Sequence, residues 1–163
     1  MTQSDTVVPF PAKADAPRKA SSSEQIWGKA IMSHGYTAVP SIMVRAQSRL
    51  GINPTQFSIL VQLLEYWRSP ECRPFPTKKD IAGRLGLDEK TIQINIRTLE
   101  KAGLVQREQR KTAAGYWSSN VYYLDGLIEK IRKMEPEFAE EKRKRAEERR
   151  RVETPKGLRR TSA

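Results

Sequence analysis

The sequence has little of the chemistry on which enzymes and metal sites usually depend. Its 163 residues include a single cysteine, Cys72, and a single histidine, His34. One cysteine excludes a disulfide within the chain and fits a reducing compartment, and the two residues are too few for the usual Cys/His zinc sites. The sequence holds no Ser/His/Asp arrangement, Walker-type motif or glycine-rich phosphate loop. We therefore expect a protein that is not an enzyme and that needs no cofactor or metal.

Long hydrophobic runs are also missing. No apolar stretch approaches the roughly 18–20 residues that span a bilayer, so we expect no membrane partner. The N-terminus does not show a basic stretch followed by an apolar core. No signal peptide is therefore expected.

Acidic residues are too few to balance the basic ones. The chain has 30 lysines and arginines against 19 aspartates and glutamates, a formal charge of +11. Residues 39–133 alone hold 16 basic and 9 acidic residues, so most of the excess lies in the region expected to fold. A small, strongly basic protein points first to nucleic acid, and then to an anionic membrane or an acidic partner.

The most informative segment is residues 77–104, TKKDIAGRLGLDEKTIQINIRTLEKAGL. Its pattern predicts a short helix, a tight turn at Gly86, and a second helix that begins after Asp88 and ends at Gly103. The inner side of both helices is apolar and carries Ile81, Leu85, Leu87, Ile92, Ile96 and Leu99. The outer face of the second helix is polar and basic and carries Lys90, Thr91, Gln93, Ile94, Arg97 and Lys101. This layout is typical of a helix-turn-helix whose second helix enters the major groove of DNA.

The flanking segments complete a winged helix-turn-helix, a mostly α fold with a β-hairpin wing. The expected elements are helices at 41–50, 55–68 and 126–134, a proline-rich connection at 69–76, and strands at 104–111 and 120–124. The loop between the strands contains Gly115. Helices followed by a hairpin are the order of elements in this fold.

Three regions are expected along the chain. Residues 1–23 are rich in proline, alanine, serine and lysine, and are predicted to be a disordered tail. Residues 24–134 are predicted to form the winged helix-turn-helix domain. Residues 135–163 lose almost all apolar residues and are predicted to be a basic tail that is either a solvated helix or disordered.

The segment DIAGRLGLDEKTIQINIRTLEKAGLVQRE resembles the winged helix-turn-helix proteins of bacteria and of their phages and plasmids. The resemblance rests on Leu99-Glu100-Lys101-Ala102-Gly103-Leu104-Val105, which leads from the second motif helix to the wing, and on FPTKKDIAGRLGL before it. It covers about residues 40–133 and implies this fold, DNA binding and a cytoplasmic location. Asn95 departs from the family pattern, which has a small or apolar residue there, and is expected to be half-buried and hydrogen-bonded.

Two groups of residues are predicted to contact DNA from the motif helices. Thr77, Lys78 and Lys79 begin the first helix, where the fold touches phosphates. Gln93 and Arg97 lie one turn apart and are suited to adenine and guanine edges. Ile94 either meets a thymine methyl group or packs against the wing or another helix.

The hairpin supplies a third group. Arg107, Arg110 and Lys111 are predicted to follow the first strand of the wing, near the minor groove or the flanking backbone. Tyr116 and Trp117 at its tip either stack on sugar or base, or fold back on the tip itself.

These features predict a sequence-specific protein that binds double-stranded DNA. A transcription regulator is the first interpretation, and a replication initiation or maintenance factor of a plasmid, phage or integrative element is the alternative. A protein-interaction module that does not bind DNA fits the basic charge less well. The sequence leaves a homodimer open.

Overall fold

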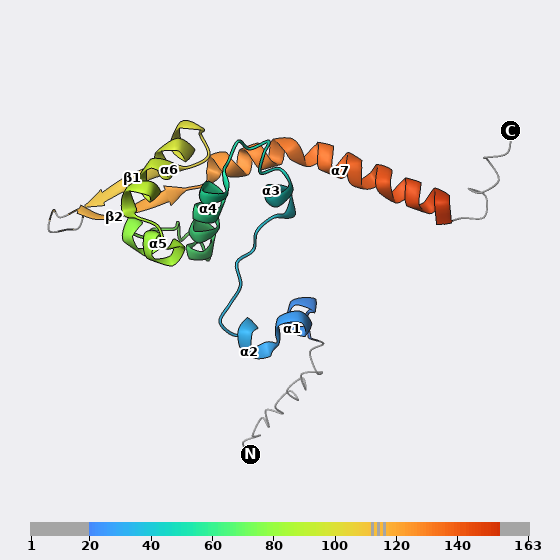
Figure 1. Cartoon of the computed structure of the whole chain (residues 1–163), viewed down its shortest axis with the longest axis horizontal. Helices are drawn as coiled ribbons and strands as arrows, with labels where there is room; N and C mark the ends of the chain where they lie inside the picture. The colour runs from blue at the N-terminus through green and yellow to red at the C-terminus, as the bar shows by residue number, and fades with distance from the viewer. Residues whose placement is uncertain (1–19, 112, 114, 116, 154–163) are drawn as a thin grey trace, which may run out of the picture. The chain divides into compact units, whose positions relative to one another are not determined.

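The chain divides into two compact units, residues Met1–Tyr36 and Thr37–Ala163. The computed structural model describes residues 20–153 apart from 112, 114 and 116, and for 117 and 118 it describes the backbone only (Figure 1). Most of the predicted N-terminal tail and the last ten residues of the predicted basic tail lie outside the described residues.

The described part of the first unit consists of two short helices, α1 Ser22–Trp27 and α2 Lys29–Met32. The backbone N–H of Glu24 donates to the Ser21 hydroxyl at the start of α1, and Gly28, with φ of 83°, separates the two helices. Neither helix has a buried residue. The sequence predicted one domain from residue 24, but these helices have no core of their own and belong to a separate unit.

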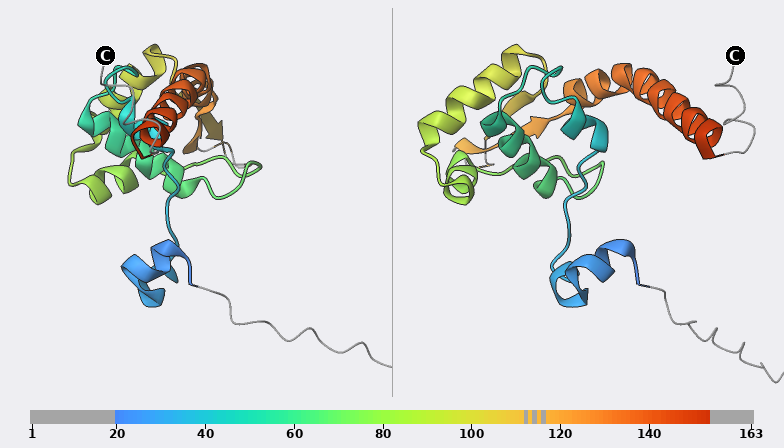
Figure 2. Two further views of the ribbon diagram at one scale, coloured as in Figure 1. Left: turned by 90° about the vertical axis from the view of Figure 1, so that its right-hand side faces the viewer. Right: turned by 45° about the vertical axis from the view of Figure 1, so that its right-hand side comes forward.

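In the described residues the second unit holds two helices, a pair of motif helices, a hairpin and a long terminal helix (Figures 1 and 2). Its elements are α3 Ser41–Arg45, α4 Pro54–Tyr66, α5 Lys78–Leu85, α6 Glu89–Lys101, β1 Gln106–Lys111, β2 Trp117–Tyr123 and α7 Asp125–Glu153. The order and the paired strands confirm the predicted winged helix-turn-helix, mostly α with a β-hairpin. Within the described residues no helix is long and apolar enough to cross a membrane.

One core lies under the motif helices. Met43, Ile59, Leu60, Leu63, Ile81, Ile92, Ile96, Leu99, Leu104, Tyr122 and Leu124 are essentially inaccessible to solvent. They come from α3, α4, α5, α6, β2 and the residues that flank the hairpin, so these segments of the second unit share one cluster. The inner stripe predicted for the second motif helix is therefore confirmed as the core face of α6. Leu85 packs at the edge of the core and Leu87 is 37% exposed, so the first helix and the turn contribute less.

The hairpin is short and irregular near its tip. Its strands pair antiparallel, with Arg107 opposite Tyr122 and Gln109 opposite Asn120, and the register shifts between Gln109 and Lys111. The backbone N–H of Tyr122 donates to the Pro74 carbonyl oxygen at 2.9 Å, so the proline-rich connection runs along the outer edge of β2.

Two predicted helices differ in length from the observed ones. The helix expected at 41–50 ends at Arg45 and continues as turns to Gly51, whose φ is 69°. The helix expected at 126–134 continues through Pro136 to Glu153, so of the two forms predicted for the basic tail the solvated helix is the one observed up to that residue. Proline removes one backbone hydrogen bond from a helix, but this part of α7 is solvent-exposed, so water can satisfy the freed carbonyl group. Ion pairs one turn apart join Lys144 to Glu140, Arg145 to Glu141 and Arg149 to Glu153, and they support the exposed part of α7.

The start of α7 lies directly against the end of α6. A Cβ atom placed on Gly126 would be 2.0 Å from the carbonyl oxygen of Gly103, so only glycine allows this approach. The Leu127 N–H donates to the Leu104 carbonyl at 3.1 Å, and Lys130 Nζ donates to the Ala102 carbonyl at 2.7 Å. These contacts fix α7 to the point where α6 leads into the hairpin.

Candidate nucleic-acid interface

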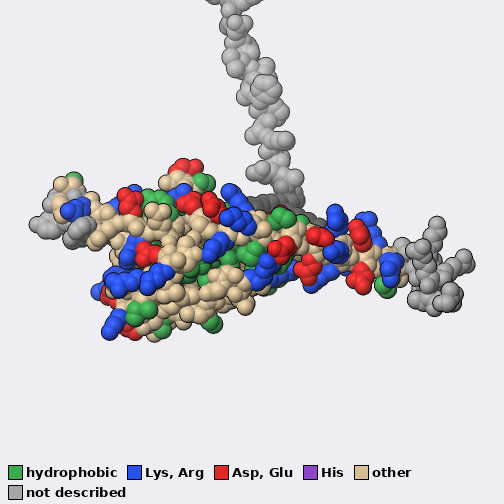
Figure 3. Space-filling model, turned by 90° about the horizontal axis from the view of Figure 1, so that it is seen from above, with side chains coloured by type: hydrophobic (Ala, Val, Ile, Leu, Met, Phe, Trp, Pro, Cys, Tyr) green, Lys and Arg blue, Asp and Glu red, His purple; other side chains and the backbone are tan. Residues whose placement is uncertain are grey.

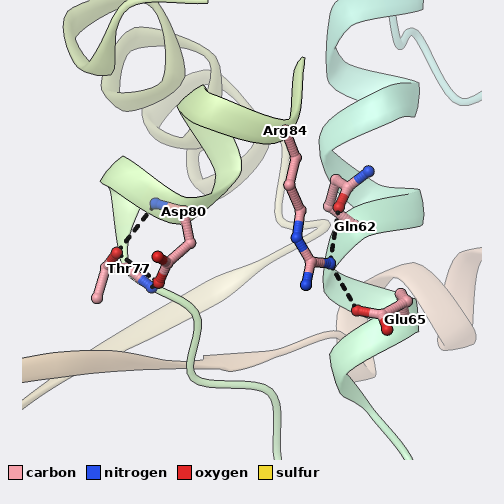
Figure 4. A network of polar contacts seen from close by, with 5 residues as sticks. All are labelled: Gln62, Glu65, Thr77, Asp80 and Arg84. Carbon is pink, nitrogen blue, oxygen red and sulfur yellow. Dashed lines mark hydrogen bonds and ion pairs between the residues drawn. The ribbon is translucent and has the colours of Figure 1, made fainter. Parts of the chain in front are cut away.

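A reciprocal cap fixes the N-terminus of α5. The Asp80 N–H donates to the Thr77 hydroxyl oxygen, and the Thr77 N–H donates to the Asp80 carboxylate, each at 3.0 Å (Figure 4). The Thr77 hydroxyl also donates to that carboxylate at 2.6 Å. The side chain of Thr77 is therefore engaged within the helix end, and the adjacent Lys78 and Lys79 are the cations available there.

Arg84 holds the other end of α5 against α4. Its Nη1 donates to Glu65 Oε2 at 2.8 Å and to Gln62 Oε1 at 3.3 Å (Figure 4). Its guanidinium also lies 4.6 Å from the centre of the Tyr66 ring. The ion pair with Glu65 raises the pKa of Arg84 further, so this clamp keeps its charge. These contacts orient α5, whose two lysines begin the interface.

The turn between the motif helices follows the predicted pattern. Gly86 adopts a left-handed conformation, with φ of 65°, and Asp88 caps α6. The Thr91 N–H donates to Asp88 Oδ1 at 2.7 Å, and the Thr91 hydroxyl donates to Oδ2 at 2.6 Å. Thr91 was predicted to contact DNA, but its side chain is half-buried and engaged by the cap.

The outer face of α6 leaves most of its predicted contact residues accessible. Lys90, Ile94, Arg97 and Lys101 are exposed, and Gln93 is half-buried. Ile94 is 52% exposed, so a large part of it is accessible on the outer face of α6. Asn95 is half-buried and its amide donates to the Thr91 carbonyl at 2.9 Å, which confirms the expectation for that residue.

The basic residues of the hairpin differ from one another. Arg107 is half-buried and forms an ion pair with Glu100 of α6 at 3.3 Å. Arg110 and Lys111 are exposed. Tyr116 lies outside the described residues, and only the backbone of Trp117 is described, so the prediction of stacking at the tip stays a prediction.

A polar hollow joins the three predicted groups. It is lined by Thr77, Lys78, Lys79, Glu89, Gln93, Arg107, Gln109, Ser119 and Asn120. It thus brings the start of α5, the first half of α6 and the hairpin to one place. Sequence reasoning missed Gln109 and Asn120 because it selected only cations on the wing. In the structure they lie opposite each other in the two strands, two residues from Arg107 and Tyr122, and the sequence alone did not give this register.

Residues 39–144 match the sequence family of the DnaD N-terminal domain. The chain belongs to this family. Among solved structures, the N-terminal domain of the DnaD protein from Geobacillus kaustophilus HTA426 aligns with a TM-score of 0.51 at 17% identity, over 77% of this chain and 99% of that chain. At this identity the similarity concerns the fold alone, and it supports the winged helix assignment of a DnaD-type domain.

Two further solved structures are more distant. A possible transcriptional regulator from Methanosarcina mazei Go1 aligns with a TM-score of 0.42 at 16% identity, over 63% of this chain and 82% of that chain. The crystal structure of MarR aligns with a TM-score of 0.37 at 18% identity, over 85% of this chain and 99% of that chain. In a comparison with curated protein sequences, none matches this chain.

The two capping aspartates are expected to make the stability of the motif helices sensitive to acid. Hydrogen bonds from Thr77 hold the pKa of Asp80 below its usual value, and hydrogen bonds from Thr91 do the same for Asp88. A lowered pKa means that the stabilisation is complete above the usual aspartate pKa and is lost as the pH falls through the lowered values. We expect carboxyl-carbon NMR titrations to show both aspartates titrating below the usual range. Thr91→Val should return the pKa of Asp88 towards its usual value and leave Asp80 unchanged, and equal behaviour of both carboxyls in that variant would contradict the assignment.

Proposed function

We propose that this protein binds duplex DNA in a sequence-dependent manner through α5, α6 and the hairpin, without catalysing a reaction. The observation that supports this most directly is that most basic side chains of these elements have no acidic partner in the described part of the protein. Lys78, Lys79, Lys90, Arg97, Lys101 and Arg110 form no ion pair with any residue in the described ranges. Two cations of these elements are paired, Arg84 at the end of α5 with Glu65 and Arg107 of the hairpin with Glu100. The other cations predicted to contact DNA that are named here therefore reach solvent without a carboxylate partner among the described residues.

Unpaired cations on one face are what a phosphate backbone requires. Binding there releases counterions from the DNA and does not first break protein ion pairs. Figure 3 shows a group of lysine and arginine side chains, with acidic ones beside them, at the end of the unit opposite the far end of α7. The charge distribution therefore supports α5, α6 and the hairpin as the DNA-facing side.

The exposed middle of α6 supports base recognition. Gln93 and Arg97 lie one turn apart and match the hydrogen-bonding groups of adenine and guanine in the major groove. Ile94, exposed between them, is suited to a thymine methyl group, because it presents an apolar side chain to solvent on a basic surface.

The family favours a role in DNA replication over one in transcription. Sequence reasoning placed a transcription regulator first and a replication factor second, because both use this fold. Membership of the DnaD family reverses that preference, since DnaD domains are associated with replication. A transcription regulator is the second candidate, because the same exposed residues of α6 can read an operator. A homodimer would place two such helices on one site, and we propose it as an arrangement to test.

The proposal is tested by selecting bound sites from random duplex DNA with the purified full chain. We expect a recurrent sequence to be enriched, and the affinity for it to fall with salt. If about 5 phosphates are neutralised, log K should fall with log salt with a slope of roughly −4 to −5. Mapping the selected sequence to replication origins or to promoters separates the two roles. No enrichment, together with no binding at low salt, would refute DNA binding.

Single substitutions separate base recognition from backbone contact. Gln93→Ala and Arg97→Ala should each cost about 1–3 kcal/mol at one or two base positions and relax the preference there. Lys79→Ala and Arg110→Ala should weaken binding to all sequences alike and lower the salt slope by about one. The measurement is binding to the selected site and to a scrambled site across a salt series. The assignment of roles fails if the two pairs of variants behave alike.

A further inference from the structure

A second surface lies on the side of α3 and α7 that the DNA interface does not use. The two helices border a groove of about 790 Å³. Figures 1 and 2 show α3 lying against the first half of α7, with the rest of α7 extending beyond it. None of the residues predicted to contact DNA lines this groove.

The floor of the groove is apolar and is formed in part by small side chains. Ile42 of α3 and Phe138 of α7 are half-buried and partly exposed to it. Ala139 and Ala146 lie two turns apart on the same side of α7. Alanine side chains let the axis of another helix approach closely, because the distance between packed helices depends on the side chains at the contact. The floor is therefore shaped for a helix that presents apolar side chains.

The rim of the groove carries positive charge that the chain does not neutralise. Arg45, Lys142 and Arg143 line it, and none of them forms an ion pair within the described ranges. Arg145 also lines it and is paired with Glu141, which leaves Glu135 as the one unpaired acid among the lining residues. A partner that covers the floor must therefore bring acidic groups to the rim, because burying several unpaired cations together is costly.

We propose that this groove binds an acidic amphipathic helix of a partner protein. Its apolar side chains, three and four residues apart, would pack on Ile42, Phe138 and the two alanines, and its carboxylates would pair with Arg45, Lys142 and Arg143. Duplex DNA fits the groove less well, because a phosphate backbone has no apolar face to cover the floor. A DNA-binding domain with such a groove would recruit a partner while α6 remains on DNA.

The test uses the full chain as bait for a phage-displayed library of random 16-residue peptides. We expect enriched sequences with apolar residues at helical spacing and several aspartates or glutamates. A fluorescent peptide with the enriched sequence should bind the full chain in an anisotropy assay, and salt should weaken that binding. Arg97→Ala should leave peptide binding unchanged while it alters DNA binding, so the outcome does not depend on the proposed DNA function.

Matched variants locate the peptide. Ile42→Glu should weaken peptide binding about tenfold or more, whereas Val44→Glu, an exposed α3 position that does not line the groove, should leave it unchanged. Lys142→Glu with Arg143→Glu should also weaken it about tenfold, and Lys144→Glu, outside the lining, should not. Thermal melts of all variants show that each is folded. The charge reversals at exposed positions keep the test valid if Ile42→Glu destabilises the protein.

Three results would overturn the proposal. One is the enrichment of basic peptides, or of none. Another is that a 24-base-pair duplex displaces the peptide bound to the Arg97→Ala variant, which would assign the groove to DNA. The third is concentration-dependent self-association that Ile42→Glu abolishes and Val44→Glu does not, which would assign it to a second copy of this chain.

Discussion

Duplex-DNA affinity at low salt is expected to fall about a thousandfold when Lys79, Arg97 and Arg110 are replaced together by alanine. The three side chains come from α5, α6 and β1 and form no ion pair in the described ranges, so each is available to DNA. A contact of this kind contributes about 1–3 kcal/mol, and each 1.4 kcal/mol or so is a factor of ten. Distant contacts add approximately, which gives the expected total. The measurement is a titration of the selected duplex at several salt concentrations.

A second triple variant removes the same charge elsewhere. Arg68, Arg132 and Lys133 are also exposed and unpaired among the described residues, but they lie outside the motif helices and the hairpin. Their replacement by alanine should weaken binding only a few-fold through the loss of general attraction. Equal losses in the two triple variants would mean that DNA responds to net charge and not to the proposed face.

Gly126→Ala is expected to lower the free energy of unfolding by about 2–4 kcal/mol. The new methyl group would lie 2.0 Å from the Gly103 carbonyl oxygen, a distance that no real contact allows. The start of α7 would have to move away from the end of α6 and lose the hydrogen bond between the Leu127 N–H and the Leu104 carbonyl. Urea denaturation followed by circular dichroism measures the loss.

Gly83→Ala is the matched control. Gly83 lies within α5, is exposed, and has nothing within 4 Å of the place where a Cβ atom would go. Alanine favours a helix over glycine, so this variant should be stabilised by about 0.5–1 kcal/mol. An unchanged stability of Gly126→Ala, measured beside a stabilised Gly83→Ala, would show that the close approach at Gly103 is not maintained in solution.

The sequence predicted those parts of the fold in which local pattern and tertiary packing agree. The stripe of Ile92, Ile96 and Leu99, the turn glycine Gly86 and the cap Asp88 each act within one helix or its neighbour, and all are found as expected. The winged helix-turn-helix fold follows from these residues, whereas the DnaD family was identified only by the sequence-family match. A period of three to four residues places a core without knowledge of the rest of the chain.

Two kinds of feature were not predicted from the sequence. Some depend on how distant segments pair, and others depend on which neighbouring side chain a polar group binds. Gln109 and Asn120 line the hollow only because the strands pair in that register. Thr91 lies on the polar side of α6, but its hydroxyl is engaged by Asp88, which residue type alone does not reveal. The sequence left open whether residues beyond Pro136 are a solvated helix or disordered, because they lack an apolar stripe, and the structure continues α7 to Glu153 with support from ion pairs.

The fixed joint between α6 and α7 has a mechanical consequence. Helix α7 has 29 residues, which at 1.5 Å per residue makes it about 44 Å long. If it moves as one body with the end of α6, a rotation of about 10° at Gly126 displaces its far end by about 8 Å. A small change in the tilt of α6 therefore produces a much larger displacement at the far end of α7. A fluorescent label near Val152 would report that displacement.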